Sequence, residues 1–122
     1  YGLREGLSLI LEEGLEKRWE RHRACHELLV AGLAELGLTL LPAPEQALWT
    51  LNAVRIPEGV EDVPVRQHLL QQYNIEIGGG LGPLRGKIWR IGLMGHSATK
   101  ANVQLLLAGL REALAAQGYQ VP

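Results

Sequence analysis

Apolar residues recur every three or four positions in four segments of the chain, which is the spacing that places them along one face of an α-helix. The predicted helices are residues 2–13, 15–36 and 63–73, and a fourth that ends near residue 117. In the second helix the side chains expected to face inward are Leu15, Trp19, His22, Leu29, Leu33 and Leu36. In the fourth helix they are Val103, Leu106, Leu107, Leu110 and Leu114.

Residues that start or stop helices stand at the ends of these segments. Gly14 and Gly37 are placed to end the first two helices, because glycine adopts the left-handed conformation that closes a helix at little cost. Asp62 is placed to cap the third helix, and Ser97 or Thr99 to cap the fourth.

Two segments rich in strand-forming residues, 48–56 and 87–93, predict β-strands, and shorter strands are expected at 38–41 and 75–77. Elements in this order favour an α+β fold, a two-layer sandwich with helices on one face of a small, mostly antiparallel sheet. A length of 122 residues fits a single domain, residues 1–122.

Side chains alternate along a strand, and this alternation separates Arg90 from its neighbours. Trp89, Ile91 and Leu93 fall on one side, which we expect to face the helices. Arg90 then faces the opposite side of the sheet, where its planar guanidinium matches a carboxylate with two parallel hydrogen bonds. The alternative is a surface arginine or a structural ion pair with an acid such as Glu76.

A glycine-rich connection precedes that strand and contains Gly78, Gly79, Gly80 and Gly82. Glycines permit the close approach of a ligand or of another chain segment. The connection lacks the Lys and Ser or Thr that complete a phosphate-binding P-loop. The alternative is a tight turn that needs glycine for its positive φ angles.

Composition narrows the classes of function. A hydrophobic fraction of 47% excludes intrinsic disorder, and the balance of 12 Lys and Arg against 13 Asp and Glu makes a nucleic-acid partner unexpected. The single Cys excludes a disulfide framework. No apolar run approaches the roughly 20 residues that cross a bilayer, so we expect no membrane partner. The single Cys suits a reducing compartment, and a cytoplasmic location is predicted.

Two further groups of side chains contain residue types that can carry chemistry. His22, Cys25 and His26 share a helical face that could grip zinc, but a closed site takes four ligands and the sequence suggests no fourth. A buried Cys between amphipathic His residues is therefore favoured. His96 and Ser97 are adjacent, yet no acid orients the His. We expect neither a metal site nor a catalytic residue in this chain.

Several stretches of the sequence resemble the C-terminal part of alanine–glyoxylate aminotransferases. These enzymes, also called serine–pyruvate aminotransferases, are class V pyridoxal-phosphate enzymes of fold type I. The matching stretches are residues 1–7, 13–16, 19–23, 75–83, 86–95 and 98–103. The chain begins inside a helical pattern without Met, which indicates a piece of a longer protein.

The resemblance implies a role for the residues singled out above. Arg90 matches the family arginine that binds the substrate α-carboxylate, in agreement with the alternation argument. Gly78, Gly79, Gly80 and Gly82 match the loop beside the active site, where they supply backbone shape rather than chemistry.

In this family a lysine of the N-terminal large domain forms the Schiff base with pyridoxal 5'-phosphate. Lys17, Lys87 and Lys100 are the only lysines here, and none matches the cofactor lysine. We therefore expect the isolated chain neither to hold the cofactor nor to transaminate, while the full-length protein does both.

The resemblance implies amino-group transfer from alanine or serine to glyoxylate or pyruvate in a homodimer. The alternatives are another class V transaminase, of the aminoethylphosphonate–pyruvate type, and a non-enzymatic α+β module for ligand binding or oligomerisation. Some animal relatives are peroxisomal, but the chain ends without a peroxisomal signal. Leu3, Leu7 and Leu11 would lack a packing partner without the large domain, so we expect the chain alone to self-associate.

Overall fold

The fold was analysed in a computed structural model that describes all residues 1–122. The helices are α1 (Gly2–Glu13), α2 (Leu15–Glu35), α3 (Asp62–Tyr73) and α4 (Lys100–Ala116). The strands are β1 (Leu51–Arg55), β2 (Gly78–Gly79) and β3 (Ile88–Gly92). Apart from the strand expected at 38–41, their order along the chain is the predicted one, and the α+β prediction is confirmed.

The strands form one antiparallel sheet in the order β1-β3-β2, so β3 lies in the middle. β1 and β3 pair along all five residues of each strand. β2 contributes only two residue pairs, Gly78 with Arg90 and Gly79 with Trp89. The position of β2 therefore depends on a short ladder and on whatever packs against it.

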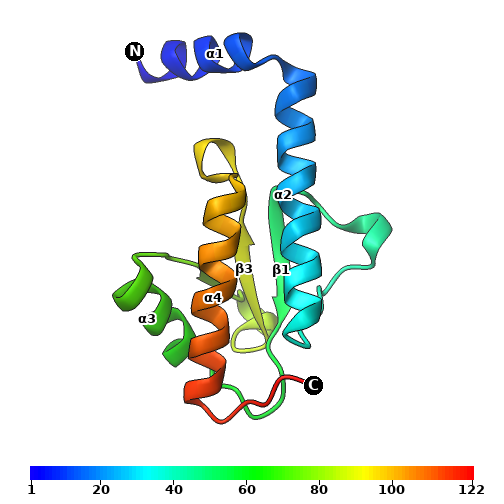
Figure 1. Ribbon diagram of the computed structural model, residues 1–122, viewed down its shortest axis with the longest axis vertical. Helices are drawn as coiled ribbons and strands as arrows, with labels where there is room; N and C mark the ends of the chain where they lie inside the picture. The colour runs from blue at the N-terminus through cyan, green and yellow to red at the C-terminus, as the bar shows by residue number, and fades with distance from the viewer.

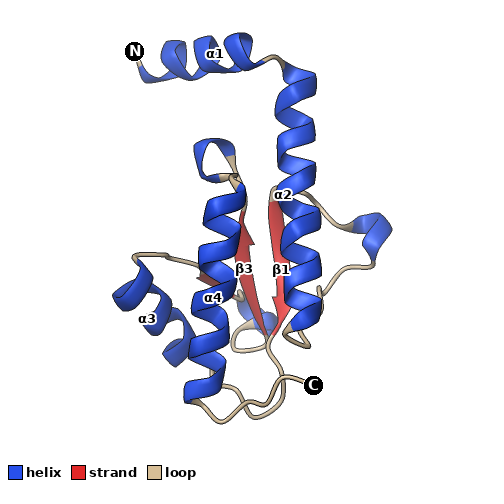
Figure 2. Cartoon of the chain, in the orientation of Figure 1, coloured by secondary structure: helices blue, strands red, loops and turns tan.

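Helices cover one face of this sheet. Figures 1 and 2 show α2 and α4 side by side in front of β1 and β3, with α3 beside α4. The apolar stripes of α2 and α4 meet the sheet in one core, whose fully buried members include Leu29, Leu33, Trp89, Leu110 and Leu114. At the start of α4 the Asn102 backbone N–H donates to Thr99 Oγ1 at 3.2 Å, so Thr99 provides the predicted cap.

α1 projects away from the sandwich, and none of its residues is buried (Figure 1). Gly14, with φ of 84°, separates it from α2. At this elbow the Glu13 carboxylate accepts hydrogen bonds from Arg18 at 2.9 Å and from Arg21 at 2.6 and 3.0 Å. The elbow is thus held by charge-assisted hydrogen bonds rather than by apolar packing.

Arg21 also joins α2 to the turn that follows β3. Its Nη1 donates to the carbonyl oxygens of Gly95 and Ala98, both at 2.8 Å. His22 adds a further link, because its Nε2 accepts the Gly95 backbone N–H at 3.0 Å. One face of α2 therefore anchors both the elbow and the end of the central strand.

The prediction that Leu15 and Trp19 face the interior is wrong. They are 55% and 57% exposed, while Leu29 and Leu33 farther along α2 are fully buried. α2 is longer than the sheet and extends beyond it. Its first turns have the spacing of a buried face, but no strand lies beneath them.

Three strand predictions also need correction. The segment 38–41 makes only one isolated bridge, from Leu40 to Val54, and the strand expected at 48–56 begins only at Leu51. The strand expected at 75–77 is irregular, and pairing with β3 starts at Gly78 instead. Ladder pairing uses backbone groups, so the glycines can form a strand without side chains that favour one.

No helix has both the length and the apolar character that a membrane span requires.

The elbow predicts a pH-dependent contribution to stability. The hydrogen bond from Arg21, with that from Arg18 and both positive charges, lowers the pKa of Glu13 from 4.5 to about 2, against the opposing effect of burial. A depressed pKa means that the stabilisation is complete above pH 4.5 and is lost as the pH falls towards 2. We expect Glu13→Gln to lower the urea midpoint at neutral pH, and this difference from the unmodified chain to shrink across that interval. A difference that stays constant down to the lowest pH would contradict this account.

Candidate functional site

The central strand β3 presents opposite chemistry on its two faces. Trp89 and Ile91 are 0% and 2% exposed and point to the helices, whereas Arg90 is half-buried on the face without helices. The predicted alternation is confirmed. Ile88, on the same face as Arg90, is nevertheless buried, because the turn at Gly82–Leu84 lies close to it.

Arg90 is held by the backbone of its neighbour strand. Its Nε donates to the carbonyl oxygen of Gly79 at 2.7 Å. Its partners across the ladder are Ala53 on β1 and Gly78 on β2, so the smallest side chains flank it on both sides. A Cβ at Gly78 would lie 3.1 Å from Arg90 Nη2, which shows how closely the guanidinium covers β2.

The terminal nitrogens of Arg90 donate to no protein group, and Arg90 takes part in no ion pair. The ion pair with Glu76 that was the alternative is therefore not formed. A guanidinium fixed through Nε and free at its two Nη atoms presents the edge that binds a carboxylate bidentately.

A shallow hollow of about 360 Å³ lies at Arg90 on this open face. Its walls include Leu48, Leu51 and Leu84, which are 63%, 41% and 37% exposed, and no carboxylate lines it. An apolar wall lowers the local dielectric and strengthens the attraction between a cation and an anion. The hollow thus combines one arginine with apolar walls.

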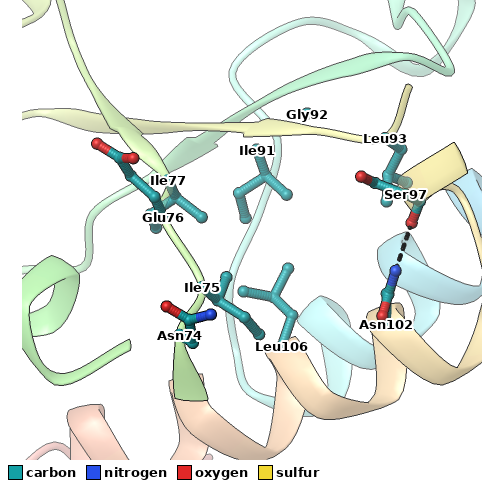
Figure 3. A pocket seen from close by; sticks show the side chains of 10 residues that line it. All are labelled: Asn74, Ile75, Glu76, Ile77, Ile91, Gly92, Leu93, Ser97, Asn102 and Leu106. Carbon is teal, nitrogen blue, oxygen red and sulfur yellow. Dashed lines mark hydrogen bonds between the residues drawn. The ribbon is translucent and has the colours of Figure 1, made fainter. Parts of the chain in front are cut away.

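A second hollow, of about 290 Å³, lies on the helix side of β3. Figure 3 shows Ile75, Ile91 and Leu106 pointing into it, while the Glu76 carboxylate points away from its centre. At one end the Asn102 side-chain amide donates to the Ser97 carbonyl oxygen at 3.0 Å. No cationic side chain lines this hollow, in contrast to the hollow that Arg90 lines.

The four glycines singled out from the sequence serve different purposes. Gly78 leaves room for Arg90, as described above. A Cβ at Gly80 would collide with the Leu84 carbonyl oxygen, so this position admits no side chain. Gly82 has open space around it but φ of 52°, and it alone of the four needs glycine for its backbone angle.

Asp62 is not the predicted helix cap. It is the first residue of α3, and the N-cap, Glu61, makes no side-chain capping bond. The Asp62 carboxylate instead accepts hydrogen bonds from Trp89 Nε1 at 3.0 Å and from Arg66 at 2.8 and 3.1 Å. The bond to Asp62, more than the opposing effect of burial, raises the pKa of Arg66. Sequence reasoning missed this network because its members are brought together only by the tertiary fold.

The His and Cys residues of α2 have structural partners. His22 Nδ1 donates to the Arg18 carbonyl oxygen at 2.7 Å, since its Nε2 is already an acceptor. His26 Nδ1 lies 2.7 Å from Oδ1 of the buried Asn52. Cys25 is 2% exposed in the core, as the favoured interpretation predicted. The structure contains no group of three or more His, Cys, Asp or Glu arranged to hold a metal ion.

A separate titratable cluster joins α3 to α4. A hydrogen bond from Tyr73 to the Glu112 carboxylate lowers the pKa of Glu112 and raises that of Tyr73. His68 Nε2 lies 3.4 Å from the same carboxylate. The cluster ties the two helices together at the surface and lines neither of the hollows described above.

Comparison with known proteins identifies this arrangement. The chain is 49% identical over 114 residues to the (S)-ureidoglycine–glyoxylate transaminase of Bacillus subtilis, covering 93% of the chain and 27% of that protein. It is 46% identical over 115 residues to the alanine–glyoxylate aminotransferase of Callithrix jacchus, covering 93% of the chain and 28% of that protein. The crystal structure of the ureidoglycine–glyoxylate aminotransferase from Bacillus subtilis superposes with a TM-score of 0.94 at 46% identity, over 98% of this chain and 31% of that one.

The chain belongs to the class V aminotransferases. Its fold corresponds to the C-terminal domain of these enzymes, and it spans only between 27% and 31% of the length of the relatives just named. No family model matches the chain.

The lysines of this aminotransferase domain do not fit a cofactor site. Lys17, Lys87 and Lys100 are all exposed, and none lines a hollow described here. A lysine that forms a Schiff base needs a site that can desolvate its amine and enclose the cofactor. The residues present do not form such a site, so pyridoxal phosphate cannot be assigned to this domain alone.

The glycines of the aminotransferase loop should differ in their tolerance of alanine. Gly80→Ala forces a backbone shift and should cost about 2–3 kcal/mol or more, as overpacking does. Gly82→Ala should cost about 1–2 kcal/mol for its left-handed backbone. Gly78→Ala meets only a flexible side-chain end and should stay within about 0.5 kcal/mol. Urea unfolding of the three variants measures this order, and equal losses would contradict the assigned roles.

Proposed function

We propose that the full-length protein is a pyridoxal-phosphate-dependent aminotransferase that moves an amino group from a small amino acid, alanine or serine, to glyoxylate or pyruvate. The names of both curated relatives reported above contain glyoxylate, which favours glyoxylate as the acceptor. The donor differs between those two names, so the acceptor is the better supported half of the reaction.

The observation that carries this proposal is the state of Arg90. The guanidinium is fixed by the Gly79 carbonyl oxygen and has no acidic partner, and Arg90 is one of the residues that line the apolar hollow on the open face. Amino donor and oxo acid acceptor each bear a carboxylate next to the reacting carbon. One arginine can therefore bind both substrates in turn at the same place.

Arg90 acts in this proposal by orientation rather than by acid–base chemistry. Two parallel hydrogen bonds from the Nη atoms fix the plane of a carboxylate, and the bond to Gly79 prevents the guanidinium from turning with it. Leu48, Leu51 and Leu84 line the hollow beside Arg90 and would limit the water that competes for that carboxylate. The position of the adjacent carbon is thereby set by the sheet.

The cofactor and the rest of the active site belong, in this proposal, to the N-terminal large domain and to a second subunit. Pyridoxal phosphate would supply the electron sink of the reaction. The exposed apolar side chains of α1 support such an arrangement, because Leu3 and Leu11 are 79% and 82% exposed and have no packing partner within the chain.

Replacing Arg90 tests the assignment in the full-length enzyme. Arg90→Ala should raise the KM of both the amino donor and the oxo acid by about tenfold to a hundredfold, the effect of losing a charge-assisted pair. Cofactor binding, read from the absorbance of the bound pyridoxal phosphate, should not change. Arg90→Lys should restore only part of the affinity, because an ammonium lacks the planar fork.

Arg55→Ala is the matched control for this experiment. Arg55 lies on the same face of the sheet, two residues from Ala53, but its side chain is exposed and donates from Nη2 to the Leu41 carbonyl oxygen at 3.3 Å. We expect its removal to leave both KM values unchanged. Unchanged KM values in Arg90→Ala, or an equal rise in Arg55→Ala, would refute the assignment.

The position of the lysines predicts that the isolated 122-residue chain forms no stoichiometric Schiff base. Incubation with pyridoxal phosphate, reduction with borohydride and mass spectrometry should give only substoichiometric, scattered adducts on exposed amines. A single adduct per chain at one lysine would show that the domain holds the cofactor by itself.

A further inference from the structure

The two glycines of β2 lie between charged groups on opposite faces of the sheet. On the open face, a Cβ at Gly78 would lie 3.1 Å from Arg90 Nη2. On the helix side, a Cβ at Gly79 would lie 3.2 Å from Asp62 Oδ2 and 3.5 Å from Arg66 Nε. The strand that fixes Arg90 is therefore backed directly by the Asp62 carboxylate.

Asp62 contacts the central strand as well as the back of β2. Its Oδ1 accepts the indole N–H of Trp89, which is fully buried and immediately precedes Arg90. Arg66 pairs with both carboxylate oxygens, and the Asp62 side chain is only 11% exposed. A bidentate pair shielded in this way has one preferred geometry, which fixes the carboxylate against both strands.

β2 needs such support because it has little else to hold it. Its ladder comprises two residue pairs, and glycines contribute no side chain to the core. The residues before it, 74–77, do not pair with β3. The Gly79 carbonyl oxygen, which receives Arg90 Nε, would shift if β2 moved along or away from β3.

We propose that Asp62 is a positioning residue for the substrate-binding arginine: its carboxylate, bound to Trp89 and Arg66, sets the place of β2 against β3 and so aims Arg90. This proposal rests on the function proposed above for Arg90. Asp62 touches no substrate, and its effect passes through the sheet to the opposite face. Binding of the substrate then depends on Asp62, which lies on the helix side of the sheet and not on the open face.

Asp62→Ala in the full-length enzyme provides the first test. It should raise the KM of both substrates about tenfold, because a displaced guanidinium loses part of its charge-assisted hydrogen bonding to the substrate carboxylate. The rate at saturation and the absorbance of bound pyridoxal phosphate should remain near those of the unmodified enzyme. Asp62→Asn keeps an acceptor for Trp89 and should recover part of the loss.

Glu61→Ala is the matched control. Glu61 is adjacent in sequence and exposed, and only its backbone is bonded, to the Gln117 side chain. Its replacement should leave both KM values unchanged. A rise equal to that of Asp62→Ala would show a general effect of altering the start of α3 and would overturn the proposal.

A double-mutant cycle with Arg90→Ala separates positioning from general destabilisation. If Asp62 acts through Arg90, its replacement should not change kcat/KM further once Arg90 is gone. A loss that adds in full to that of Arg90→Ala would overturn the proposal. If Asp62→Ala does not fold, the same cycle with Asp62→Asn decides by the same criterion.

The same variants distinguish a failure of the function proposed for Arg90 from a failure of the role proposed for Asp62. If Arg90→Ala leaves both KM values unchanged, the proposed function itself fails. If Arg90→Ala raises them while neither Asp62 variant does, Arg90 keeps its function and only the role of Asp62 is overturned.

Discussion

The close packing on both sides of β2 is the constraint on which the site depends. Arg90 packs over Gly78 on the open face, Asp62 and Arg66 pack over Gly79 on the helix side, and the absence of Cβ atoms leaves room for this close packing. Asp62 neutralises Arg66, whereas nothing in the chain neutralises Arg90. Arg66, on the helix side of β2, therefore has an acidic partner, whereas Arg90, on the open face, has none.

One-sided covering of the sheet explains why that cation is available. The helices bury the apolar face of β3 and supply the core, while the opposite face has no second layer from this chain (Figure 2). The end near Ile88 is closed by the following turn, and the part around Arg90 stays open. One face of β3 therefore contributes to the core, while the other face carries Arg90.

The sequence predicted correctly which side chains are buried wherever the spacing of residues within one helix or strand determines their burial. The alternation of Trp89 and Arg90 follows from strand geometry, and the burial of Leu110 and Leu114 follows from helical spacing. The predictions were wrong where burial depends on the length of the sheet beneath a helix, or where a side chain bonds to a residue far away in the sequence. Trp19 has the spacing of a core residue but lies beyond the sheet, and Asp62 has the sequence context of a cap but bonds to a tryptophan 27 positions away.

The site shows the same division. The open-face placement of Arg90 could be predicted, because one strand suffices to define it. The bond to Gly79 could not, since glycine-rich segments usually indicate turns and here two glycines form the edge strand. The distinct roles of Gly78, Gly80 and Gly82 depend on neighbours that no local pattern reveals.

The bonds of Arg21 have a mechanical consequence. One guanidinium grips Glu13 at the end of α1 and two carbonyl oxygens in the turn that leaves β3. Swinging α1 about Gly14 must therefore either break that grip or pull on the turn. Arg21 therefore couples the orientation of α1 to the turn that follows the strand carrying Arg90.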